Sequence, residues 1–167
     1  MKFYISYKNS ELKGDTSKDL ERAIVATSVV MTQYLKKNPH FAGVQDVTLT
    51  LTLCGRTKIK TLNRTYRNKD KVTDVLSFPI YENLRPDKKV KEKNLPQMDL
   101  GDLIICREVA KAQSKEFKVT YPQEIIHLIV HGFLHLLGFD HEVSLKEEVI
   151  MEKEEAKLVR AVYKKLK

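Results

Sequence analysis

Three of the protein's five histidines, His131, His135 and His141, fall within one short stretch of the chain. His131 and His135 are four positions apart, so on a helix their imidazoles lie one turn apart on the same face and can bind one metal ion. A third ligand cannot follow on that face, because each further turn rises about 5.4 Å and a zinc–nitrogen bond is only about 2.0–2.1 Å long. Gly138 can end the helix in the left-handed conformation, which lets His141 return to the same ion.

The resulting pattern, H-x-x-x-H-x-x-G-x-x-H, differs at one position from the metzincin peptidase motif H-E-x-x-H-x-x-G-x-x-H. The second residue of that motif is a glutamate that acts as general base, and here it is Gly132. No cysteine lies near the histidines, so a fourth coordination position is left for water, as in catalytic zinc sites. The sequence therefore predicts one catalytic Zn²⁺ ion without the base of a peptidase.

Three neutral imidazoles leave the charge of a Zn²⁺ ion uncompensated, and a water bound to such an ion can have a pKa near 7. Hydroxide is then available without a strong protein base, and the cation can stabilise charge on a phosphate oxygen. Peptide hydrolysis would also need a proton for the amine leaving group, which the missing glutamate usually helps to supply. This chemistry favours phosphodiester hydrolysis over peptide hydrolysis.

The length of 167 residues fits one domain, residues 1–167, with a sizeable core. A formal net charge of +8 favours a polyanionic partner. The N-terminus lacks the features of a signal peptide, and no run approaches the roughly 20 apolar residues of a membrane span, so we expect no membrane attachment. Buried free thiols are the favoured interpretation of Cys54 and Cys106, and a disulfide stays open.

The pattern of apolar residues predicts an α+β fold, in which one mixed sheet of about four strands packs with about five helices and the metal site lies on a helix and the turn after it. Strands are expected at residues 3–7, 47–53, 73–79 and 100–106. Helices are expected from a capping box at Thr16–Asp19 to about residue 38, early in 56–71, and over 107–117, 121–137 and 144–166.

The last predicted helix should turn five apolar side chains inward: Leu145, Val149, Val159, Val162 and Leu166. Residues 81–98 are polar and rich in lysine, and we expect them to form a mobile surface loop. Residues 56–71 carry seven lysines and arginines against one acidic residue, Asp70, and this cluster can attract an RNA backbone.

Three stretches taken together resemble the YbeY family of metal-dependent endoribonucleases. Residues 62–67, followed by 73–79, are similar to the first signature of the family, 101–106 to the second, and 131–141 to the third. One departure is Val72, where the family usually has proline, and it affects only the expected stiffness of a loop.

The resemblance implies a bacterial cytoplasmic protein that binds zinc through His131, His135 and His141. It also implies single-strand-specific RNA cleavage in 16S ribosomal RNA 3′ end maturation and in ribosome quality control, with the small ribosomal subunit as a partner. Arg67 matches the family's functionally important arginine. A guanidinium can bind two phosphate oxygens at once, so we expect Arg67 to hold the phosphate. The alternative for Arg67 is a solvated side chain or a surface ion pair.

Four further residues keep two interpretations each. His127 either supports a ligand histidine or is simply packed, and Asp140 either orients a ligand or caps the turn. Tyr66 and Phe78 can stack on bases, although packing is favoured. Two other functions also remain: an RNA- or ribosome-associated binding protein with a structural metal, and a metallopeptidase whose carboxylate comes from elsewhere in the fold.

Overall fold

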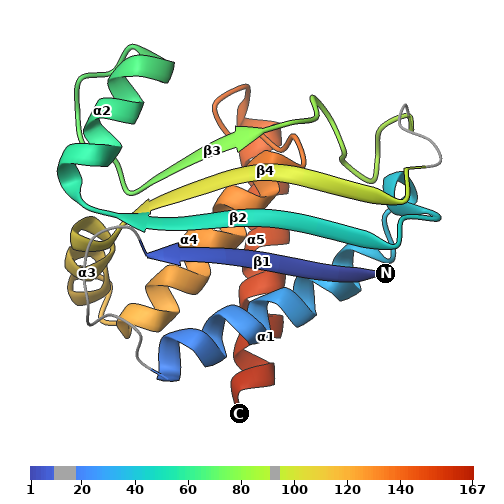
Figure 1. Cartoon of the computed structure of the whole chain (residues 1–167), viewed down its shortest axis with the longest axis horizontal. Helices are drawn as coiled ribbons and strands as arrows, with labels where there is room; N and C mark the ends of the chain where they lie inside the picture. Colours follow the sequence, from blue (N-terminus) through green and yellow to red (C-terminus); the bar gives the residue numbers. More distant parts are fainter. Residues whose placement is uncertain (10–17, 91–94) are drawn as a thin grey trace.

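The computed structural model describes residues 1–9, 18–90 and 95–167 as one mixed four-stranded sheet packed with five α-helices (Figure 1). The α+β fold expected from the sequence is confirmed. The elements follow the chain as β1 Lys2–Asn9, α1 Lys18–Leu35, a 3₁₀ helix Pro39–Phe41, β2 Asp46–Cys54, α2 Arg56–Arg67, β3 Val75–Pro79, β4 Gln97–Cys106, α3 Arg107–Glu116, α4 Tyr121–Leu136 and α5 Leu145–Leu166.

The sheet has the strand order β1-β2-β4-β3. β1, β2 and β4 run parallel, and β3 pairs antiparallel with β4 at the edge of the sheet. The alternation in β2 places Val47, Leu49, Leu51 and Leu53 in the core, where α1 and α4 cover one face of the sheet and α5 packs against these two helices (Figure 1). In the part of the chain that the structure describes, no helix combines the length and apolarity needed to cross a membrane.

α4 is the helix that carries His131 and His135, and local sequence features explain both where it starts and how closely it packs. The Thr120 hydroxyl accepts from the Gln123 N–H, the Gln123 side chain accepts from the Thr120 N–H, and Pro122 occupies the first turn. At Gly132 an added Cβ would lie 2.6 Å from the Leu103 side chain of β4. The glycine therefore lets α4 lie close against the sheet.

The expectation of a surface loop over residues 81–98 is wrong at Leu84 and Arg85 and at the start of β4, and residues 91–94 of that range lie outside the described part of the chain. Leu84 is fully buried, with its N–H bonded to the Leu137 carbonyl at 2.9 Å and its carbonyl to the Asn38 side chain at 2.8 Å. Arg85 is also buried and forms ion pairs with Asp87 and Glu147. The segment is held against the end of α4, and β4 already begins at Gln97.

The inward face predicted for the last helix is wrong at its start. Leu145 is 81% exposed and Val149 is also exposed, because helical spacing places them on a different face of α5 from the buried residues Met151, Leu158 and Val162. The predicted capping residue Thr16 lies outside the described residues. Cys54 and Cys106 are buried free thiols on adjacent strands.

Candidate active site

His131, His135 and His141 meet in a cleft of about 590 Å³ between the C-terminal end of α4, the edge strand β3 and α2. One ligand atom from each histidine lies within 4.8 Å of the others, and the Nε2 atoms of His131 and His135 are 3.2 Å apart. Two nitrogens on a tetrahedral zinc ion are about 3.3 Å apart when each bond is about 2.0–2.1 Å. The spacing of the His131 and His135 donors therefore fits such an ion.

The turn that returns His141 to the cluster has the conformation expected from Gly138. Its φ angle is +91°, and its N–H bonds to the His135 carbonyl at 2.9 Å. A Cβ at this position would also lie 3.0 Å from the Glu82 carbonyl oxygen. Asp140 stabilises the same turn, because its carboxylate accepts from the Glu142 N–H at 2.9 Å. Of the two interpretations of Asp140, this contact supports the turn cap.

Glu155 on α5 contacts His131 on the side of the imidazole that faces away from the cluster. Its carboxylate lies 2.8 Å from Nδ1 of His131 and 2.6 Å from Nε2 of His127. Burial opposes ionisation of this carboxyl, but the hydrogen bonds to His127 and His131 outweigh it and lower the pKa of Glu155 to about 2. An ionised carboxylate only accepts, so His131 donates through Nδ1–H, and the lone pair of its Nε2 faces the cluster.

His127 lies outside the ligand cluster and pairs with Glu155 instead. The hydrogen bond to Glu155 raises the pKa of His127 despite its burial, with Glu124 adding to the effect. The rise per helical turn, which excludes a third ligand on the same face of the helix, agrees with this placement. Through Glu155, His127 is linked to His131, one of the candidate ligands.

His135 is held in the form that a metal ligand needs. Burial, followed by the proximity of His131 and His141, lowers the pKa of His135 to about 4. Its imidazole is therefore neutral at physiological pH and offers a lone pair.

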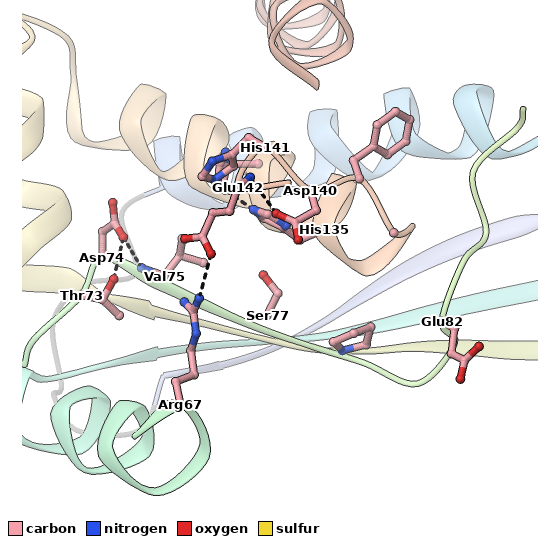
Figure 2. Close-up of a pocket in the computed structure, with 14 residues that line it drawn as sticks. Arg67, Thr73, Asp74, Val75, Ser77, Glu82, His135, Asp140, His141 and Glu142 are labelled. Atoms are coloured by element: carbon pink, nitrogen blue, oxygen red, sulfur yellow. Dashed lines mark hydrogen bonds and ion pairs between the residues drawn. The ribbon is translucent and has the colours of Figure 1, made fainter. Parts of the chain in front are cut away.

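Arg67 reaches the same cleft from the last position of α2, far from the histidines in sequence. Its Nη2 atom is 3.8 Å from the Glu142 carboxylate, and the side chain is 44% exposed (Figure 2). An exposed ion pair of this length contributes little, typically about 0–1 kcal/mol. The guanidinium is thus held near the histidines by a contact that a phosphate can replace.

The other basic side chains of α2 lie on its exposed surface. Among them, Lys60 pairs with Asp70 at 3.6 Å. Tyr66 is 64% exposed and packs edge-on against Phe78, with the ring centres 5.2 Å apart. The two rings therefore pack against each other, but core packing, the favoured interpretation, is wrong for Tyr66.

Carboxylates also line the cleft, and the metallopeptidase alternative would need one of them to replace the missing glutamate. Asp74 accepts from the Thr73 hydroxyl, the Val75 N–H and the Gln113 amide, and these bonds outweigh burial and lower its pKa. Glu142 pairs with Arg67. At the position of the peptidase glutamate, a Cβ on Gly132 would meet Leu103 of the sheet.

Glu155 is the residue at the candidate site that the sequence interpretation missed. It lies four residues after Met151 and three before Leu158, both buried, so helical spacing places it on the inward face of α5. A glutamate in an otherwise apolar inward face was the available signal. Its partner on α4 depends on how the two helices pack, which spacing alone does not give.

The chain is similar to a known protein family over most of its length. The sequence profile of the family described as Endoribonuclease YbeY matches residues 7–163. The chain is 40% identical over 116 residues to an endoribonuclease YbeY of Staphylococcus aureus, covering 70% of this chain and 72% of the relative. It is 47% identical over 96 residues to that of Staphylococcus carnosus, covering 58% and 60%.

A solution structure of a Thermotoga maritima protein is similar over 98% of this chain and 91% of its own, with a TM-score of 0.60 and 28% identity. The family resemblance and the enzyme class expected from the three sequence signatures are therefore confirmed. This chain belongs to the endoribonuclease YbeY family.

Proposed function

We propose that this protein is a zinc-dependent endoribonuclease that cuts single-stranded RNA. By its family, it acts in 16S ribosomal RNA 3′ end maturation and ribosome quality control, in the cytoplasm and on the small ribosomal subunit. The observation that carries the proposal is one cleft lined by three metal-binding histidines and an arginine. The histidines are the proposed ligands, and Arg67 is the proposed catalytic residue.

Arg67 would bind the phosphate at the cleavage point. Its planar, permanently charged guanidinium can donate to two phosphate oxygens, and only the exposed Glu142 has to be displaced. The exposed basic surface of α2 next to it extends the positive charge along the path of the RNA. These residues bind and orient the phosphodiester.

The histidines would hold one zinc ion, which supplies a Lewis acid and a bound water with a pKa near 7. Glu155 keeps His131 in the tautomer whose Nε2 lone pair faces the cluster. In the described part of the chain the cluster has three members, which leaves a coordination position for water or a phosphate oxygen. The three-ligand set favours a catalytic over a purely structural metal.

The test is cleavage of labelled single- and double-stranded RNA of the same sequence, before chelation, after chelation and after return of zinc. We expect cutting of the single strand that stops on chelation and resumes with zinc. Analysis of the product ends identifies which oxygen attacks. Unchanged cutting without metal would contradict the proposal, and metal-stabilised protein that binds RNA without cutting it would support the structural-metal alternative.

A further inference from the structure

The edge strand β3 borders the cleft with Val75, Ser77 and Pro79. Two hydrogen bonds fix which of its backbone groups face β4: the Cys106 N–H donates to the Asp74 carbonyl, and the Ile80 N–H donates to the Leu100 carbonyl. In an antiparallel ladder the hydrogen-bonded positions recur at every second residue. With the constant register of β3 and β4, the even-numbered residues of β3 bond to β4.

The odd-numbered residues therefore point their backbone groups away from β4, toward the open edge. The Val75 N–H is taken by the Asp74 carboxylate at 2.8 Å, and Pro79 has no N–H. What remains on this edge within Val75–Pro79 is one donor, the Ser77 N–H, beside its own carbonyl and those of Val75 and Pro79. Figure 2 shows Ser77 between Arg67 and the histidines.

A single adjacent N–H and C=O pair matches the Watson–Crick edge of an unpaired base. Adenine and cytosine offer a ring nitrogen acceptor beside an amino donor, and guanine and uracil offer a carbonyl acceptor beside a ring N–H donor. Each base can thus accept from the Ser77 N–H and donate to the Ser77 carbonyl. A base inside a duplex has already used this edge, so the contact selects single strands without selecting sequence.

An extended peptide is the other ligand that binds the free edge of a sheet. A peptide strand needs alternating donors and acceptors over several residues, and here Asp74 and Pro79 remove the donors on either side of Ser77. The basic surface of α2 beside the cleft also favours a polyanion. These observations favour a nucleobase over a peptide.

We propose that the backbone of Ser77 is a nucleobase-binding subsite that holds an unpaired base next to the cleaved phosphate. The inference rests on the proposed endoribonuclease function and adds the physical basis of its preference for single strands. Arg67 and the histidines engage the phosphate, and Ser77 engages the neighbouring base. The side-chain hydroxyl of Ser77 is not needed for this contact.

The protein variants that test it are Ser77→Pro and Ser77→Ala. Proline removes the N–H at a position where that group does not serve the sheet, and the same edge already carries Pro79. Alanine removes the hydroxyl and keeps the N–H. We expect single-strand affinity about tenfold lower for Ser77→Pro than for Ser77→Ala, the size of one lost hydrogen bond, with equal melting temperature and metal content.

Changes in the RNA supply a second test, whose first measurement uses only the wild-type protein. A series of single-stranded RNAs carries one abasic site, or one base methylated on its Watson–Crick edge, at each position in turn. The affinity of the wild-type protein for each RNA is measured. We expect one position next to the cut where either change weakens binding about tenfold, and where Ser77→Pro then adds no further loss.

Equal affinity of Ser77→Pro and Ser77→Ala, or full additivity with the abasic substrate, would overturn the subsite. If Ser77→Pro does not fold, uniform tolerance of base methylation by the wild-type protein would overturn it alone. If RNA displaces a bound extended peptide while no base change alters the RNA affinity, the result would favour a peptide as the ligand of this edge. Wild-type protein that does not cut RNA at all would instead contradict the proposed function.

Discussion

The two walls of the cleft are built in different ways. The wall formed by α4 and its turn places half-buried histidines, fixed by helical spacing, by Gly138 and by the carboxylate of Glu155. The opposite wall presents Arg67 at the end of α2, with its side chain 44% exposed and held by an ion pair of 3.8 Å. The first wall is pre-organised for a metal, and the second can rearrange around a phosphate. This difference separates their expected responses to mutation, salt and pH.

The largest effect is expected on the histidine wall. His135→Ala should lose the metal and reduce cleavage by at least about a thousandfold, which corresponds to about 4 kcal/mol of transition-state stabilisation. His127→Ala should keep one metal per chain at saturating zinc, because His127 lies outside the cluster. Metal analysis of both variants checks this, and one metal per chain in His135→Ala would remove His135 from the ligand set.

A smaller effect on the same wall is expected from Glu155→Gln. The amide accepts less strongly and does not fix the tautomer of His131, so zinc affinity should fall about 10- to 100-fold, as for other residues that support a ligand. Glu152→Gln, an exposed change on the same helix, is the control. Competition with a zinc chelator measures both. Equal zinc affinities of Glu155→Gln and Glu152→Gln would show that the Glu155 contact does not affect zinc binding.

The basic wall should respond to salt. RNA affinity should fall steeply as salt rises, and Arg64→Gln on the exposed surface of α2 should flatten the log–log slope by about 0.7 if one phosphate contact is lost. Lys165→Gln near the end of α5 is exposed and distant from α2, and should leave the slope unchanged (Figure 1). Titrations at several salt concentrations measure this, and affinity independent of salt would contradict an electrostatic path for RNA.

The smallest effect concerns Asp74, which stabilises the start of β3 between the two walls. Its lowered pKa means that the carboxylate adds stability above its unfolded value of about 3.9, and this stability is lost as pH falls through the folded pKa. Asp74→Asn should cost about 1–2 kcal/mol at pH 7. Denaturant titrations at several pH values should show the difference from wild type shrinking below about pH 4. A constant difference would mean that the charge of Asp74 is not involved.

Sequence reasoning succeeded where a feature depends on local spacing. The i, i+4 histidines, the glycine turn, the start of α4 at residue 121 and the alternation of β2 are all readable in single segments. It failed where the outcome depends on packing between distant segments. Leu84 is buried because the end of α4 bonds to it, and Leu145 is exposed because another face of α5 packs against α1 and α4. The pairing of Glu155 with His131 belongs to the same class.

The measurement that tests the joint action of the two walls most directly is single-turnover cleavage at saturating RNA by Arg67→Ala, with zinc content and melting temperature determined on the same sample. Zinc and folding should be unchanged while the rate falls about a hundredfold, or about 3 kcal/mol. Arg67→Lys should recover only part of this loss, because an ammonium lacks the two-oxygen geometry. A rate for Arg67→Ala equal to that of wild type would contradict a catalytic role for Arg67 and leave the histidine wall to act alone.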